Sequence, residues 1–296
     1  MTYNEKIIEC DNITHYYGDR LIYEGLSFEV EKGKILGLLG KNGTGKTTII
    51  NILNGYLKPR SGICRLFGED MNSISPKTKS KVGLLLEGHI QHSYFTVGQI
   101  ERFYSSFFSK WNRDAYYELL KKLQVLPNQK ISTMSCGQRS QIALGLLFAQ
   151  DPELLILDDF SMGLDPGYRR LFVEYLKDYA ASNGKTVFLT SHIIQDMEML
   201  IDDCMIMDYG KLLLHKPVNY IMNNFKRYRF VSQYDNFKIE HSDDIWNPSS
   251  MGNKWEIYSF LPKDAVMNIL KPYGINNCTE ENLSLEDAFI GMTGKY

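Results

Sequence analysis

The sequence lacks any long apolar run. No stretch approaches the roughly 18–20 consecutive apolar residues of a membrane-spanning helix, and residues 142–149, among the longest apolar segments, have the length of a buried helix. Residues 1–6 also lack the basic-then-apolar pattern of a secretory signal. We therefore expect a cytoplasmic chain that does not itself cross a membrane.

The sequence also has few cysteines and a small net charge. The five cysteines are scattered and odd in number, and no pair has the spacing of a zinc site. This usage is typical of the reducing cytosol rather than of a disulfide framework. The formal net charge of −2 gives no argument for a nucleic-acid partner or for an anionic membrane surface. The 296 residues, 44% of them hydrophobic, suffice for one large globular domain or two.

One strong phosphate-binding motif is present. Residues 40–48 fit the pattern G-x-x-x-x-G-K-[ST], after a short apolar strand and before a helical segment that Gly55 closes. Glycines let backbone N–H groups converge on phosphate oxygens, and the helix N-terminus adds partial positive charge. We expect Lys46 to reach the β- and γ-phosphates and the Thr47 hydroxyl to bind Mg²⁺. The nucleotide-binding residues predicted from this motif are Gly40, Asn42, Gly43, Thr44, Gly45, Lys46, Thr47 and Thr48.

Titratable side chains follow three predicted buried strands. Asp158 and Asp159 come directly after the apolar run at 154–157, and His192 and Glu87 follow two further strands. Parallel strands place their carboxyl ends at one edge of a sheet, where α/β folds bind ligands. Taken singly, a packed histidine and a solvated glutamate are the simpler interpretations, so only the combination of these residues indicates a site.

The motifs follow one another in an order that resembles the ATPase subunits of ABC transporters, over residues 7 to about 215. Ser-Cys-Gly-Gln at 135–138 looks like a variant of that family's S-G-G-Q signature and opens a predicted helix. Residues 154–159 look like Walker B followed by the catalytic acid, and Gly-Leu-Asp-Pro at 163–166 is similar to the D-loop. Glu87 and His192 occupy the positions of the glutamine-type loop residue and the switch histidine.

The resemblance implies that two such subunits close around two ATP molecules. Each nucleotide would lie between the P-loop of one chain and Ser135, Gly137 and Gln138 of the other, since a helix N-terminus suits a γ-phosphate. Asp158 would hold Mg²⁺ mainly through water, and Glu87 would sense the metal and the attacking water. The other implied roles are adenine stacking by Tyr17, γ-phosphate contact by His192, catalysis by Asp159 and communication across the dimer by Asp165.

The resemblance also implies a fold and partners. The predicted fold class is α/β: a P-loop NTPase (RecA-like) core with a mixed sheet, an inserted helical subdomain and a small C-terminal α+β appendage. The ABC ATPase domain would span 1–215, with its core at 1–90 and 151–215 and its helical subdomain at 91–150, and the appendage would span 216–296. The partners would be a second ATPase subunit, identical or a paralogue, and a separate multi-span membrane permease, with no nucleic acid.

The end of the chain suggests a subgroup. Residues 285–294, Leu-Glu-Asp-Ala-Phe-Ile-Gly-Met-Thr-Gly, look like the last segment of the ABC-2 type exporters. A subunit of this kind would lie on the cytoplasmic face of the membrane through its permease. The aromatic-rich stretch 91–108 is a candidate for the groove that receives the permease, and ordinary subdomain core is the competing interpretation.

Three residues depart from the family pattern. Asp159 stands where glutamate is usual, so its carboxylate falls about 1–1.5 Å short, and a displacement of about 1 Å can cost on the order of 100-fold in rate. Slow hydrolysis is one hypothesis, and a backbone adjusted to the shorter side chain is the other. Cys136 replaces a signature glycine, and Phe160 replaces the proline after the acid pair.

Two other functions stay open at this point. One is a soluble ABC-type ATPase that remodels a macromolecular assembly. The other is a slow-hydrolysing nucleotide switch, which only Asp159 motivates. The chain has neither the long coiled coils of the DNA-repair members nor the two ATPase halves of the translation-factor members, so export is the leading interpretation.

Overall fold

The computed structural model describes residues 5–86, 93–122, 124–161, 164–234 and 237–294. Its central sheet contains β3 (Ile35–Gly40), β6 (Val82–Leu85), β7 (Leu154–Leu157), β8 (Thr186–Thr190), β9 (Asp203–Asp208) and β10 (Lys211–Pro217). The strand order is β10-β9-β3-β8-β7-β6, parallel except for β10. Every residue of β7 and β8 is buried, as expected for parallel strands covered on both faces.

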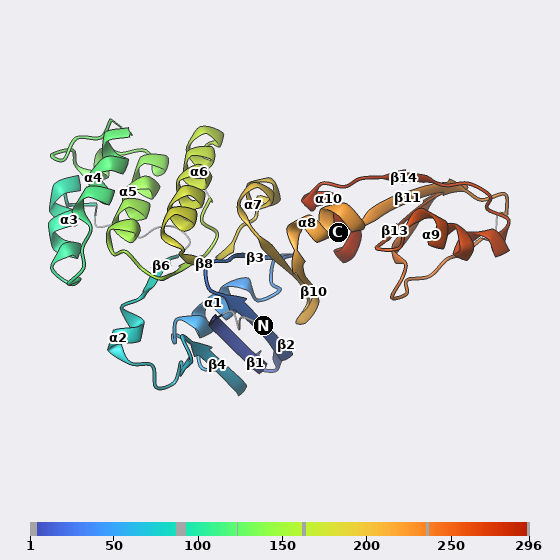
Figure 1. Cartoon of the computed structure of the whole chain (residues 1–296), viewed down its shortest axis with the longest axis horizontal. Coiled ribbons are helices and arrows are strands. Elements are labelled where there is room, and N and C mark those ends of the chain that lie inside the picture. The colour runs from blue at the N-terminus through green and yellow to red at the C-terminus, as the bar shows by residue number, and fades with distance from the viewer. Residues whose placement is uncertain (1–4, 87–92, 123, 162–163, 235–236, 295–296) are drawn as a thin grey trace.

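One face of this sheet packs against a second sheet and a helix. The antiparallel strands β1 (Lys6–Tyr17), β2 (Arg20–Glu31), β4 (Ser61–Leu66) and β5 (Glu69–Asp70) have the order β2-β1-β4-β5. They enclose α1 (Lys46–Leu53) in one core, in which Phe28 of β2 stacks on Phe188 of β8 with ring centroids 5.9 Å apart. The short helix α2 (Pro76–Lys79) follows at the edge (Figure 1).

Helices cover the other face and extend past it. The helices α3 (Val97–Ser105), α4 (Arg113–Lys122) and α5 (Cys136–Ala149), with a 3₁₀ turn at Ile131–Thr133, lie between β6 and β7 in the chain and share a core of their own. Beside them, α6 (Pro166–Asn183) and α7 (Ile194–Leu200) pack on the central sheet. Figure 1 shows α3 and α4 at one end of the molecule, away from the central sheet.

The C-terminal residues form the opposite end (Figure 1). Strands β11 (Lys226–Val231), β12 (Trp246–Met251), β13 (Lys254–Ser259) and β14 (Thr279–Glu281) make an antiparallel sheet in the order β12-β13-β11-β14. The helix α9 (Lys263–Leu270), extended by a 3₁₀ turn at Lys271–Tyr273, covers one of its faces. Helices α8 (Val218–Asn224) and α10 (Leu285–Thr293) instead join the core of the central sheet.

The α/β fold class predicted from the sequence is confirmed, including the mixed sheet. None of the helices in the described part of the chain combines the length and the apolar character that crossing a bilayer requires. The division into domains at 90, 150 and 215 stays a prediction. The helix α10 packs against α7 and α8, and buried residues of α8 and α10 belong to the core of the central sheet.

Candidate nucleotide-binding site

The P-loop connects β3 to α1 in a backbone shape that requires glycine. Gly45 is the N-cap of α1 and has φ 101, a left-handed conformation. A Cβ atom on Gly45 would lie 2.5 Å from the hydroxyl oxygen of Tyr23. Tyr23 is fully buried on β2, and its hydroxyl donates a hydrogen bond to the Gly45 carbonyl. This contact fixes the loop where the N–H groups of α1 begin.

Lys46 is held inside the loop. Its ammonium donates hydrogen bonds to the carbonyl oxygens of Gly40 at 2.7 Å and Lys41 at 3.1 Å. The residue is 9% exposed, and burial lowers the pKa of the ammonium, while the carboxylates of Asp159 and Asp158 act in the opposite direction. A buried cation at a helix N-terminus is suited to the negative charge of phosphates.

Asp158 and Asp159 follow the end of β7, and both form a hydrogen bond with Thr190 at the end of β8. Thr190 donates its hydroxyl to Oδ1 of Asp158 at 2.8 Å, and the N–H of Asp159 donates to the same hydroxyl at 2.9 Å. Asp158 and Asp159 are 3% and 4% exposed. Thr190 therefore sets the relative position of both acids across the two neighbouring strands.

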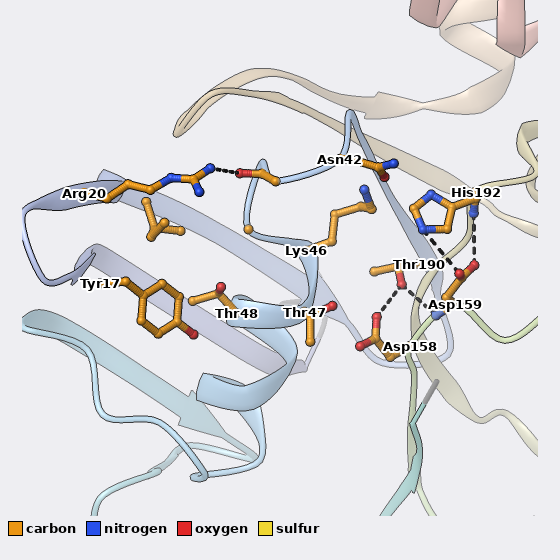
Figure 2. Close-up of a pocket in the computed structure, with 13 residues that line it drawn as sticks. Tyr17, Arg20, Asn42, Lys46, Thr47, Thr48, Asp158, Asp159, Thr190 and His192 are labelled. Atoms are coloured by element: carbon orange, nitrogen blue, oxygen red, sulfur yellow. Dashed lines mark hydrogen bonds and ion pairs between the residues drawn. The ribbon is translucent and has the colours of Figure 1, made fainter. Parts of the chain in front are cut away.

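Asp159 and His192 face each other at the edge of the site (Figure 2). The backbone N–H of His192 donates to Oδ1 of Asp159 at 3.1 Å, and Nε2 of its ring lies 3.3 Å from Oδ2. Asp159 has φ 43, an uncommon conformation that aspartate adopts more readily than most residues. The imidazole is about half exposed, so the pair combines a buried carboxylate with an accessible ring.

These groups surround a cavity of about 260 Å³ (Figure 2). Tyr17, 49% exposed, lies near Thr48, across the P-loop from His192. The site residues predicted from the sequence that line the cavity are Tyr17, Asn42, Gly43, Gly45, Lys46, Thr47, Thr48, Asp158, Asp159 and His192. Gly40 and Thr44 belong to the same loop without lining the cavity, and Glu87 lies outside the described residues.

Three lining residues escaped prediction: Arg20, Ile22 and Thr190. The guanidinium of Arg20 donates to the Gly43 carbonyl at 3.2 Å and so supports the loop from β2. In the sequence, Arg20 is indicated only by its position shortly after Tyr17. Thr190 is indicated only by its position two residues before His192. Neither position indicates a contact without the strand pairing.

The signature residues lie elsewhere, at the start of α5. Ser135 caps α5 and forms a capping box with Gln138, and Gly137 packs so close to the Tyr168 ring that a Cβ atom would lie 2.6 Å from it. Asp165 caps α6 by accepting hydrogen bonds from two backbone N–H groups. None of these four predicted residues lines the described cavity.

The fold and the cavity define a P-loop nucleotide-binding protein, and its similarities specify the family. The family model described as ABC transporter matches residues 23–161. The chain is 33% identical over 209 residues to the Nod factor export ATP-binding protein I of Burkholderia orbicola (strain AU 1054), covering 69% of this chain and 68% of that relative. It is 28% identical over 298 residues to the bacitracin transport ATP-binding protein BcrA of Bacillus licheniformis, covering 97% of both.

A solved structure agrees in fold. The structure of an ATP-binding subunit of an ABC transporter matches with a TM-score of 0.65 at 22% identity, covering 73% of this chain and 92% of that one. The chain belongs to the ATP-binding subunits of ABC transporters, a family of ATPases. The domain of this family binds ATP or ADP, and the cavity at the P-loop is the candidate site for that nucleotide.

Proposed function

We propose that the chain powers an exporter: it pairs with a second ATPase subunit around ATP and drives a separate permease from the cytoplasmic face of a membrane. The observation that carries the proposal is the convergence of the P-loop, two strand-end carboxylates and His192 on one cavity. The names of the relatives, Nod factor export and bacitracin transport, support export. The permease would select the cargo, so the transported substrate would be determined by that partner rather than by this chain.

The cavity residues would have different roles in phosphoryl transfer. The N–H groups of α1 and the Lys46 ammonium would bind the β- and γ-phosphates. Asp159 and His192 would hold the proton of an attacking water, since they are the acid and the imidazole that meet at the edge of the cavity. Tyr17 would stack on adenine from the far side of the loop.

Thr47 and Asp158 fit Mg²⁺ because both offer hard oxygen donors beside the loop. Magnesium usually takes one or two protein ligands together with phosphates and water. Consistent with this, the described residues contain no group of three or more histidine, cysteine or acidic side chains placed to hold a metal alone. The ion would neutralise charge on the transferring phosphate, and Thr190 would keep Asp158 in place for it.

An aromatic patch on the helical layer supports the permease partner. It consists of Tyr94, Phe95, Phe103 and Phe107, whose rings follow one another at centroid distances of 4.8, 5.5 and 5.2 Å. Tyr94, Phe103 and Phe107 are 73%, 42% and 68% exposed. Large exposed apolar groups in one cluster mark an interaction site more often than single ones do.

Copurification tests the exporter function. The tagged chain is expressed in its native cell, membranes are extracted gently, and the copurifying proteins are identified with their stoichiometry. We expect one multi-span membrane protein in stoichiometric amount. Tyr94→Ala should reduce its recovery several-fold, whereas Tyr56→Ala, which removes an equally exposed tyrosine outside the patch, should not. A soluble complex without a membrane protein would instead support the remodelling function.

A slow-hydrolysing switch is a second candidate because Asp159 replaces glutamate. The structure also offers an argument against it: the left-handed backbone at Asp159 and the two contacts with His192 fit the shorter side chain.

A further inference from the structure

The last helix of the chain ends on the phosphate-binding loop. The ammonium of Lys41 donates a hydrogen bond to the carbonyl oxygen of Thr293 at 2.7 Å, although 252 positions separate the two residues. Lys41 is 8% exposed and does not line the nucleotide cavity. Thr293 is the final residue of α10, where carbonyl groups lack helical partners and carry partial negative charge. A buried ammonium is a strong partner for such a group.

The backbone of Lys41 is fixed from the other side. Its carbonyl oxygen accepts hydrogen bonds from the Lys46 ammonium at 3.1 Å and from the Thr44 hydroxyl at 2.8 Å. One residue therefore joins the end of α10 to the lysine that is expected to bind the phosphates. A displacement of α10 would be transmitted to Lys46 through two consecutive polar contacts.

The other end of α10 is attached to α7, the helix that follows His192. The backbone N–H of Leu285 donates to Oε2 of Glu198 at 2.9 Å, and Gln195 donates its amide to the carboxylate of Glu286. Figure 1 shows α10 beside α7 and α8, between the central sheet and the C-terminal sheet. The helix α10 therefore extends from α7, which follows His192 in the chain, to the P-loop.

Along its length α10 is held rigidly. Ala288, Phe289 and Met292 are buried in the core of the central sheet. Gly291 lies against Tyr258 of β13, where a Cβ atom would come within 2.5 Å of the ring. The guanidinium of Arg227 on β11 binds the carboxylate of Asp287 at 2.9 Å. The C-terminal sheet and the central core thus fix α10 from both sides.

We infer that α10 is a strut that sets the position of the P-loop relative to α7, and that Lys41 is the positioning residue through which it supports nucleotide binding. The inference rests on the proposed nucleotide site. A loop that is already ordered loses less freedom when it binds phosphates, so removal of the contact weakens ATP binding without altering any group that touches ATP.

The dissociation constant for ATP with Mg²⁺, measured by calorimetry on the full chain, tests Lys41. We expect Lys41→Met to raise Kd by about 3- to 10-fold and Lys41→Arg, which keeps a charged donor, to raise it by less than about 2-fold. Lys226→Met is the control, because Lys226 also donates to a helical carbonyl, that of Met222 at 3.2 Å, besides its hydrogen bond to Oδ1 of Asn282 at 2.7 Å. Its Kd should equal that of the wild type.

A double-mutant cycle tests the strut itself. Lys41 and Glu198 contact opposite ends of α10, so independent sites would give multiplicative changes in Kd. We expect Glu198→Ala to raise Kd for ATP as well, and the double variant Lys41→Met/Glu198→Ala to depart from the product of the single effects by about 3-fold. Urea unfolding of each variant shows whether a change in Kd accompanies a loss of fold.

The outcomes distinguish failure of the strut from failure of the proposed function. If the wild type binds ATP and both Lys41→Met and Glu198→Ala bind it with the same Kd, the strut is overturned and the proposed function stays intact. Multiplicative single effects also overturn the strut, because both ends then act independently. If the wild-type chain itself fails to bind ATP, the proposed function and the strut are both rejected.

Discussion

At the scale of the residue, Asp159 shows how a departure from a family pattern is accommodated. Its backbone lies at φ 43, where the short polar side chain of aspartate is tolerated better than the longer one of glutamate. Both carboxylate oxygens are directed to His192, one to its N–H and one toward its ring. This geometry supports the hypothesis that the backbone is adjusted to aspartate over the hypothesis of slow hydrolysis.

We therefore expect Asp159→Asn to lower kcat for ATP by about 100-fold or more, because it removes the negative charge that would hold a proton in the transition state. Asp159→Glu should leave kcat unchanged or lower it, since the longer side chain must leave its contacts with His192. Steady-state ATPase assays that separate kcat from KM provide the measurement.

Asp151→Asn is a suitable control for this prediction. Asp151 also has a left-handed backbone, with φ 51, but it pairs with Lys185 rather than with cavity residues. The kcat of Asp151→Asn should match that of the wild type. A clear rise of kcat in Asp159→Glu would contradict the prediction and favour the slow-hydrolysing switch.

The sequence predicted the members of the site whose roles depend on local spacing. Lys46 and Thr47 belong to a contiguous motif, and Asp158 follows an apolar strand, so each has a signal within a few residues. Thr190 has no such signal, because its role arises from the pairing of β7 with β8, and it bonds Asp158 across 32 positions. Contacts of this kind are properties of the fold rather than of the motif.

At the scale of the element, the start of α5 has the features of an exposed binding surface. Ser135 and Gln138 satisfy each other in a capping box, and Cys136 at the first helical position is exposed. In the proposed dimer, the N–H groups of this turn would face the γ-phosphate bound by the other subunit. A bulky group on Cys136 would stand at that surface.

Labelling of Cys136 tests this arrangement. A bulky maleimide should react selectively, because the other four cysteines are buried. We expect the labelled protein to lose ATP-dependent dimerisation in size-exclusion chromatography and to lose at least about 10-fold of its ATPase activity, since a closed dimer excludes such bulk. Cys136→Ser, treated in the same way, should retain both. Full activity after verified labelling would contradict the predicted sandwich of P-loop and α5.

Secondary structure was predictable where the pattern was strong and local. The continuous runs of β7 and β8 are typical of buried parallel strands, and α10 begins with a capping serine followed by apolar residues. The edge strands β12 and β14 lack such a pattern: β12 contains Pro248 and two serines, and β14 is three residues long. Cross-strand ion pairs, such as Arg229 with Glu281 at 2.8 Å, help to hold β14 in place.

At the scale of the whole molecule, the two faces of the central sheet belong to different cores. Alternate residues of β3, β7, β8 and β9 face α1 and the second sheet on one side and α5, α6, α7, α8 and α10 on the other. Continuous apolar runs indicate that these strands are covered on both faces, but they do not identify which distant helix covers them. That is why the return of α10 to the P-loop was not predicted.

Stability of the whole chain should depend on pH through two histidines. The ring of His15 is 6% exposed and neither nitrogen has a hydrogen-bond partner, so burial lowers its pKa from the ordinary value of 6.5. Burial also lowers the pKa of His215, which lies on β10. Both rings therefore bind protons less readily in the folded chain than in the unfolded chain.

The sign of the effect follows from this difference. As the pH falls below about 6.5, the unfolded chain binds protons that the folded chain does not, so the free energy of unfolding decreases. Urea unfolding at pH 7.5, 6.5 and 5.5 should show this decrease in the wild type. His15→Leu should make the slope below pH 6.5 shallower by up to one proton, and His15→Leu/His215→Leu shallower still, with slopes above pH 7 unchanged. An acid slope in His15→Leu equal to that of the wild type would show that this buried ring does not control the pH dependence.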